Sequence, residues 1–133
     1  METKDILDVG GKFKIEFDEE KQCVIISTPQ KNVIEISDKE KCIRLSDQNK
    51  NEIVMNSDGI TMSSCKDIKM KARDGITLDA DSKIIANAKS DISLVGLNID
   101  AQAKVKAMLK GNAVAELSAS GQTTIKGAMV MIN

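Results

Sequence analysis

The chain contains no histidine, and its 133 residues also include no Trp, no Tyr and only two Phe. The absence of histidine excludes His-dependent catalytic triads, His metal sites and the side chain that most often acts as a general base near neutral pH. Aromatic side chains bury the most area per residue and usually dominate compact cores. Any core of this chain must therefore be filled by Ile, Ala and the seven Met.

Charge and hydrophobicity exclude further classes. The net charge of −1 gives no general reason to expect nucleic-acid binding. Hydrophobic residues make up 41% of the chain, which argues against a disordered protein. The sequence has no apolar run of the roughly 18 residues that a transmembrane helix needs. The N-terminus, METKDILDVGG, lacks the apolar centre of a signal peptide, so we expect the protein to assemble in the cytoplasm.

The residues that could carry chemistry form no recognisable site. Cys23, Cys42 and Cys65 are odd in number and widely spaced, which predicts free thiols in a reducing compartment. The carboxylate pairs Glu19/Glu20 and Asp79/Asp81 read as solvated surface charge. The Ser and Thr residues have no evident base, and no glycine-rich phosphate loop is present. We expect no enzymatic activity, no metal and no cofactor.

An eight-residue repeat runs from Ile60 to Thr123, and each unit reads large-x-large-x-small before a polar corner. The three columns of the first five units are Ile60, Ile68, Ile76, Ile84 and Ile92; Met62, Met70, Leu78, Ala86 and Leu94; and Ser64, Ala72, Ala80, Ala88 and Gly96. After a slip of one residue the columns continue as Ile99, Ala107, Ala115 and Thr123; Ala101, Leu109, Leu117 and Ile125; and Ala103, Gly111, Ala119 and Gly127. Asp58-Gly59 and Asp74-Gly75 supply turn signals at two corners.

Each unit is expected to be a β-strand, because its apolar residues alternate with period two. The stretch 99–110, IDAQAKVKAMLK, is the strongest test, since its composition favours a helix. Its apolar residues nevertheless occupy alternate positions, with Met108 as the one exception. Residues two apart on a helix point to nearly opposite sides, so a helix here would have no apolar face. The pattern therefore predicts strand over helix.

Upstream of the repeat, residues 13–58 predict longer antiparallel strands. Alternating apolar positions mark them at Phe13, Ile15 and Phe17, at Val24 and Ile26, at Ile34 and Ile36, at Ile43 and Leu45, and at Ile53 and Met55. Polar turns are expected at 18–21, 38–41 and 47–51. Residues 1–12 show no convincing pattern and are expected to be a tail. The predicted organisation is thus a tail, a lead-in over 13–58 and an octapeptide shaft over 59–133.

Two architectures could bury the apolar face of such octads. Three successive octads of one chain could form a coil of a single-chain β-solenoid, or three identical chains could intertwine as a three-sided triple-stranded β-helix. The second is favoured because every strand edge then pairs with another chain, and small side chains fill a narrow axis contributed three times. The expected trimer core is Ile60, Met62, Ile68, Met70, Ile76, Leu78, Ile84, Ile92, Leu94, Ile99, Leu109, Leu117 and Ile125.

The units DGITM, KDIKMKA, DGITLDA and SDISLVG resemble the C-terminal spike of the valine–glycine repeat protein G (VgrG) family. The ending AELSASGQTTIKGAMVMIN (115–133) and the lead-in KFKIEFDEEKQCVIISTPQKNVIEISD (12–38) extend the resemblance to about residues 12–133. This family forms the tip of type VI secretion systems and is related to the baseplate spike of contractile-tailed phages. The family's large hub and most of its barrel have no counterpart here, so we expect them on a longer chain or another polypeptide.

The resemblance implies a homotrimeric needle that a contractile sheath drives through a target membrane and that leaves the cell on the injection apparatus. It also implies a hub and tail tube as partners, and a cap of the proline-alanine-alanine-arginine (PAAR) type or an effector at the C-terminal tip. That tip is expected to be Met129, Val130, Met131, Ile132 and Asn133. Some phage spikes bind iron through His, a feature that a chain without His does not share. The alternative function is a passive β-solenoid stalk, such as an adhesin or tail-fibre module.

Overall fold

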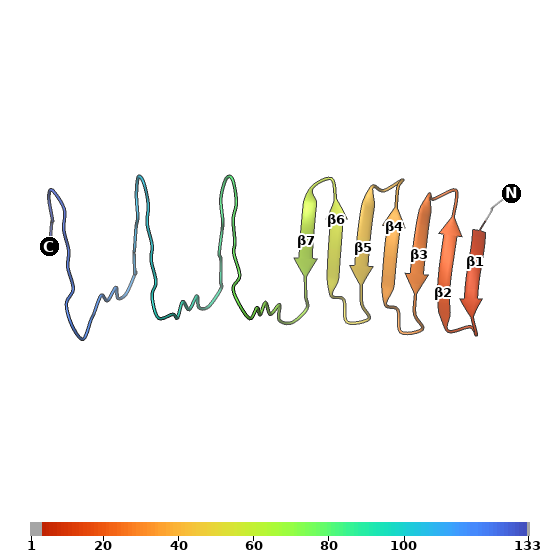
Figure 1. Cartoon of the computed structure of the whole chain (residues 1–133), viewed down its shortest axis with the longest axis horizontal. Helices are drawn as coiled ribbons and strands as arrows, with labels where there is room; N and C mark the ends of the chain where they lie inside the picture. The colour runs from red at the N-terminus through yellow and green to blue at the C-terminus, as the bar shows by residue number, and fades with distance from the viewer. Residues whose placement is uncertain (1–3, 133) are drawn as a thin grey trace. The chain divides into compact units, whose positions relative to one another are not determined.

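The computed structural model describes residues 4–132 and is all-β, with seven strands in one antiparallel sheet and no helix among those residues (Figure 1). The strands lie in chain order, so each pairs with its sequence neighbours. They are β1 (Lys4–Val9), β2 (Phe13–Asp18), β3 (Cys23–Ser27), β4 (Val33–Ser37), β5 (Cys42–Ser46), β6 (Glu52–Asn56) and β7 (Gly59–Ser63). The chain divides into two units that meet between Leu78 and Asp79, and each is described by itself.

The predicted lead-in strands are confirmed as β2 to β6, with turns between them close to the expected positions. Two boundaries differ from expectation. Residues 4–9, expected to be part of a tail, form β1, because the Gly10-Gly11 turn lets them pair back onto β2. Gly59–Ser63, expected to open the shaft, forms β7 and pairs with β6 in the same sheet.

The sheet is built from a nineteen-residue hairpin repeat that the octad pattern does not reveal. The register pairs Leu7 with Ile15, Ile26 with Ile34 and Leu45 with Ile53, each pair nineteen residues after the one before. The turns repeat with the same step. Each three-residue turn at one end of the sheet closes with a hydrogen bond from a lysine N–H to the carbonyl three residues earlier, and these lysines are Lys12, Lys31 and Lys50.

The turns are held by local polar contacts. Lys31 and Lys50 have φ values of 63° and 66°, in the left-handed region that tight turns require and that most residues avoid. At the opposite end, Asp18 accepts a hydrogen bond from the N–H of Lys21, and Ser37 accepts one from the N–H of Glu40. These contacts fix the turn lengths, and the turn lengths fix the register.

The repeat breaks before β7. The turn there has only two residues, Ser57 and Asp58, and Gly59 follows with φ of 121°. After β7, Ser64 takes the place in the next turn that Asp47 holds in the previous one, since each accepts a hydrogen bond from the N–H two residues later. Asp67 would be the turn-closing residue but does not adopt the left-handed conformation of Lys31 and Lys50. The hairpin is therefore not closed, and no eighth strand follows among the described residues.

Residues 64–132 belong to no strand and no helix. The backbone bends at a regular step, at 65–66, 73–74, 81–82, 89–90, 97, 104–105, 112–113, 120–121 and 128. The step is eight residues except between 97 and 104, where it is seven. This matches the predicted octads and the slip of one residue between Ile92 and Ile99. The region 99–110 forms no helix and no assigned strand, so its expected strand stays a prediction.

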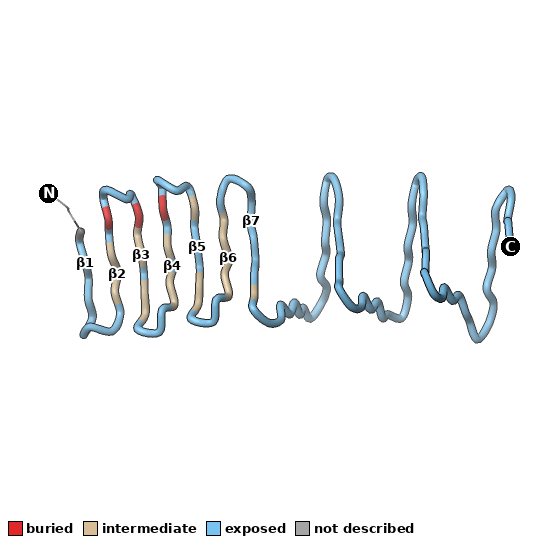
Figure 2. The backbone as a smooth tube through the Cα atoms, turned by 180° about the vertical axis from the view of Figure 1, so that it is seen from behind, coloured by how far each residue is buried: buried red, intermediate tan, exposed pale blue. Residues whose placement is uncertain are grey.

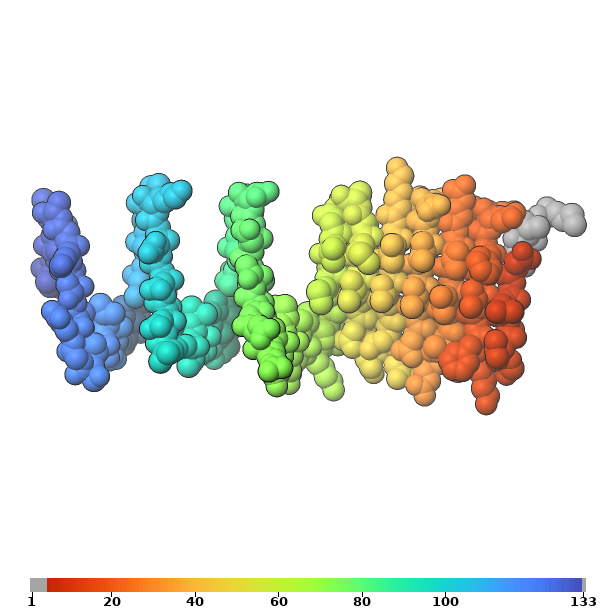
Figure 3. Space-filling view, in the orientation of Figure 1, coloured from red at the N-terminus to blue at the C-terminus, as the bar shows by residue number. Residues whose placement is uncertain are grey.

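Burial is confined to the sheet. Figure 2 shows the buried residues in β2, β3 and β4, and these are Asp18, Cys23 and Ser37. Every described residue from 65 onward is exposed. Within the second unit, Figure 3 shows successive passes of the chain standing apart with open space between them. The single chain thus has no hydrophobic core of the usual kind.

Candidate interaction surface

One face of the sheet is apolar from edge to edge, and we call it the apolar face. Because successive side chains of a strand point to opposite faces of the sheet and the register is regular, two rows of apolar side chains cross the strands. One row is Phe17, Val24, Ile36, Ile43, Met55 and Ile60. The other is Leu7, Ile15, Ile26, Ile34, Leu45, Ile53 and Met62.

Nothing in the described chain covers this face. Phe17 is 47% exposed, Ile36 46% and Ile60 71%. The chain as a whole exposes 13415 Å², whereas a compact monomer of its 14.4 kDa mass would expose about 6,800 Å². A continuous face of exposed apolar side chains marks an interaction site in a folded protein.

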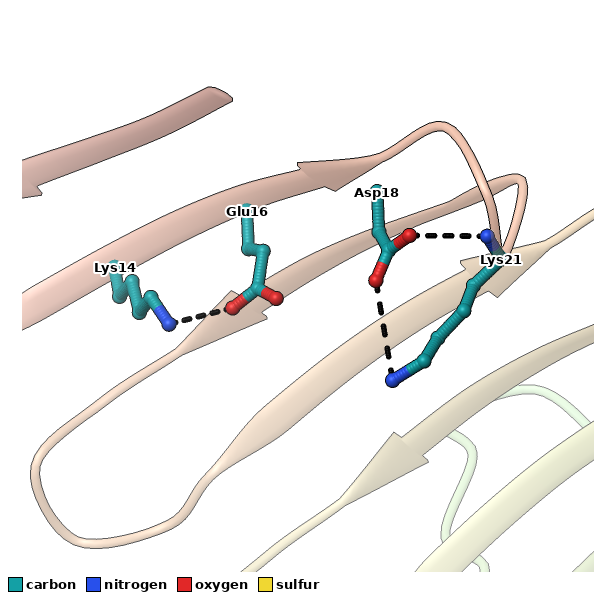
Figure 4. A network of polar contacts seen from close by, with 4 residues as sticks. All are labelled: Lys14, Glu16, Asp18 and Lys21. Carbon is teal, nitrogen blue, oxygen red and sulfur yellow. Dashed lines mark hydrogen bonds and ion pairs between the residues drawn. The ribbon is translucent and has the colours of Figure 1, made fainter. Parts of the chain in front are cut away.

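The opposite face carries charged and apolar side chains together, and the three buried residues Asp18, Cys23 and Ser37 lie on it in register. Arg44 lies between two carboxylates, with Nη1 3.9 Å from Glu35 and Nε 3.1 Å from Glu52. Figure 4 shows two further pairs, Lys14 with Glu16 and Lys21 with Asp18, the latter with Nζ 3.8 Å from Oδ2. In each of these pairs the cation stays partly exposed, and ion pairs that water can reach add little stability.

The residues predicted as a trimer core are all exposed in the single chain. Ile60 and Met62 lie on the apolar face, in β7. The remainder, from Ile68 to Ile125, lie in the segment after β7, with exposures between 52% for Ile76 and 85% for Leu109. Their common inward direction in an assembly stays a prediction.

The predicted tip is apolar and exposed as far as the structure describes it. Met129, Met131 and Ile132 are at least 80% exposed, and Val130 is 49% exposed. Asn133 lies outside the described residues. These side chains are free to contact a partner or to close the core of an assembly.

A cluster of polar side chains makes hydrogen bonds to the segment in which the chain leaves the sheet. Asn51 Oδ1 accepts hydrogen bonds from the Ser64 hydroxyl at 2.8 Å and from the Cys65 N–H at 3.3 Å. Asn51 is itself held by Asp47, whose Oδ1 accepts the Asn51 N–H at 2.9 Å and whose Oδ2 accepts the side-chain amide at 2.8 Å. These two bonds, the backbone one first, lower the pKa of the Asp47 carboxyl below its ordinary value.

The sequence analysis did not identify Asn51. A signal existed, because the pair Lys31-Asn32 recurs nineteen residues later as Lys50-Asn51. Asn32 occupies the equivalent place, and its Oδ1 accepts the N–H of Gln48 in the next turn at 3.3 Å. The two asparagines therefore act alike, except that Asn51 fixes the exit from the sheet and Asn32 fixes a turn within it.

The cysteines are free, as predicted, and differ in environment. Cys23 is buried, Cys42 is partly buried and Cys65 is exposed. Burial, followed by the negative charges of Asp18 and Glu35, raises the pKa of the Cys23 thiol above its ordinary value. The Cys23 thiol is therefore protonated at neutral pH and serves as a small apolar side chain.

The carboxylate pairs singled out in the sequence are exposed, and no metal-binding cluster appears in the described residues. Asp79 and Asp81 are exposed, as are Glu19 and Glu20. No group of three or more Cys, Asp or Glu between residues 4 and 132 is placed to hold a metal ion. No helix able to cross a membrane occurs in that range.

Comparisons with known proteins do not assign the chain to a family. The chain matches no protein-family model, and no curated protein is significantly similar to it. The function must therefore be argued from the surface itself and from the resemblance of its octads.

Proposed function

We propose that the chain is a structural subunit, a homotrimeric needle in which three copies pack their apolar faces around one axis and intertwine their octads. The observation that carries this proposal is the run of exposed residues from 65 to 132, which pairs with no strand and bends every eight residues except for one step of seven. Backbone N–H and C=O groups in extended strands need partners, and large apolar faces need cover. Two further copies supply both.

The single-chain solenoid is less well supported. In a solenoid, successive coils of one chain lie about 4.8 Å apart and form ladders with one another. The described residues after Ser63 form no such ladder, and the passes within 79–132 stand apart (Figure 3). Space between passes of one chain is the arrangement that lets other chains lie between them.

The needle's task is proposed from the resemblance to the VgrG spike family and from the apolar tip. A rigid prism with a charged outer face and no catalytic site suits a membrane-puncturing spike of a contractile injection system. Met129, Val130, Met131 and Ile132 are exposed apolar side chains. Three copies of this segment around one axis would form a flat apolar platform that a PAAR-type cap or effector can cover.

Light scattering tests both parts of the proposal. The protein alone should have three times the chain mass of 14.4 kDa, and the addition of a PAAR-type cap should increase the mass by one cap per trimer. A variant lacking residues 130–133 should remain trimeric and lose the cap. A folded monomer would contradict the trimer, and unchanged cap affinity after truncation would move the docking site elsewhere.

A further inference from the structure

The sheet ends at the edge strand β7, after which the described chain does not turn back to add another strand. β7 is the last strand of the sheet, so one of its two edges pairs with β6 and the other is open among the described residues. Alternate N–H and C=O groups of an edge strand point outward without partners. No described residue after Ser63 forms a strand that pairs with this edge.

An apolar groove lies beside this open edge. Its volume is about 340 Å³, and its floor is formed by Leu45, Ile53 and Met62, which share one row of the apolar face, together with Ile68. Met62 is 55% exposed and Ile68 is 53% exposed. The groove therefore continues the apolar face to the point where the sheet ends.

The polar cluster lies directly after β7, where the chain leaves the sheet. Asn51 binds both the hydroxyl of Ser64 and the N–H of Cys65, and Asp47 holds Asn51 through two hydrogen bonds. The Cys65 thiol also lies 3.8 Å from the carbonyl oxygen of Lys50. The first residues after β7 are thus tied to the preceding turn, in a position from which they do not fold back along β7.

We propose that the open edge of β7 and its adjoining groove bind an octad strand from a second copy of this chain. Asn51 is the positioning residue, because it holds the segment through which the chain leaves the sheet. This inference rests on the proposed trimer. It adds where along the chain strand pairing within one chain gives way to strand pairing between chains.

A second copy is the occupant that the observations favour. The edge needs a segment with apolar side chains at alternate positions, and the octads within 65–132 have that pattern, are exposed and pair with no strand in the described chain. The chain exposes 13415 Å², roughly twice the area of a compact monomer of this size. Copies of one chain would satisfy the unpaired edge and the unpaired octads together, and the groove is continuous with the face that the trimer would bury.

Amide hydrogen exchange in the intact assembly tests the inference without any mutation. If a second copy pairs with β7, all amides of Gly59–Ser63 should be protected, whereas pairing with β6 alone would protect only alternate ones. A trimeric mass with alternate β7 amides exchanging freely would overturn this inference and leave the trimer standing. A monomeric mass would overturn the trimer and this inference with it.

A matched pair of variants tests the role of Asn51. Asn51→Ala should accelerate exchange of the open-edge β7 amides by about fivefold or more, as expected for the loss of one or two hydrogen bonds. Asn32→Ala removes the equivalent bond one hairpin repeat earlier, to Gln48, and should leave β7 unchanged. Equal effects of the two variants on β7 would show that Asn51 has no special positioning role.

Discussion

Residue-level alternation carries most of the predictable information in this chain. Apolar side chains at every second position predicted the strands and which side chains share a face, and the register confirms both for β2 to β6. Asn51 was not predictable in the same way. Its partners Ser64 and Cys65 lie 13 and 14 residues later, and only a known turn geometry brings them together.

Substitutions on the two sides of one octad strand should differ sharply. Ile76→Asp would place three like charges near the axis of the proposed trimer without partners, which should cost several kcal/mol per chain. Lys71→Asp, on the outward side of the neighbouring octad, should change stability by about half a kcal/mol or less. Chemical denaturation of both variants, monitored by trimer mass, measures the difference. Similar losses would mean that the inward and outward sides are assigned incorrectly.

At the scale of strands and hairpins, the turns determine which strands form and how they pair. β1 was missed because Ile6 and Leu7 are adjacent apolar residues that break the alternation, and the strand exists through its pairing with β2 across the Gly10-Gly11 turn. The nineteen-residue hairpin repeat was missed because its sequence signal is spread over turns of equal length. The end of the sheet was not predictable for a related reason, since Asp67 occupies the turn-closing position of Lys31 and Lys50 without their positive φ.

The two Asp-Gly corners offer a matched test of turn chemistry. Gly59 has φ of 121°, a conformation that other residues rarely adopt, whereas Gly75 has no positive φ and open space around it. Gly59→Ala should therefore destabilise the protein by about 1–3 kcal/mol. Gly75→Ala should be close to neutral. Thermal unfolding of both variants distinguishes them, and a larger loss for Gly75→Ala would contradict the role given to the β7 turn.

At the scale of the whole molecule, the composition and the structure both indicate that the single chain lacks a large core. A chain with two Phe, no Trp and no Tyr cannot build a large core alone, and the structure has a sheet with one uncovered apolar face followed by unpaired octads. The all-β class was predictable because the period of two persists along the chain. The number of chains was not fixed by that pattern, since an octad strand fits one chain wound on itself or several chains wound together.

The octad itself predicts which deletions the molecule tolerates. Removing residues 76–83 takes out one whole unit, so every later bend keeps its place relative to the columns around the axis. Repeat proteins lose roughly one unit's share of stability in such a change, and we expect the trimer to persist with a fall in Tm of about 10 °C or less. The assembly is measured by light scattering and its unfolding by circular dichroism.

Removing only residues 76–79 is the control. The side chains after the deletion keep their alternation, but the bend at 81–82 moves to the middle of a strand and every later corner is displaced by half a unit. Three copies could then no longer align their corners and their small residues at the same height, so the trimer should be lost although fewer residues are removed. If the four-residue deletion is tolerated as well as the eight-residue one, the octad is not the structural unit and the intertwined prism is wrong.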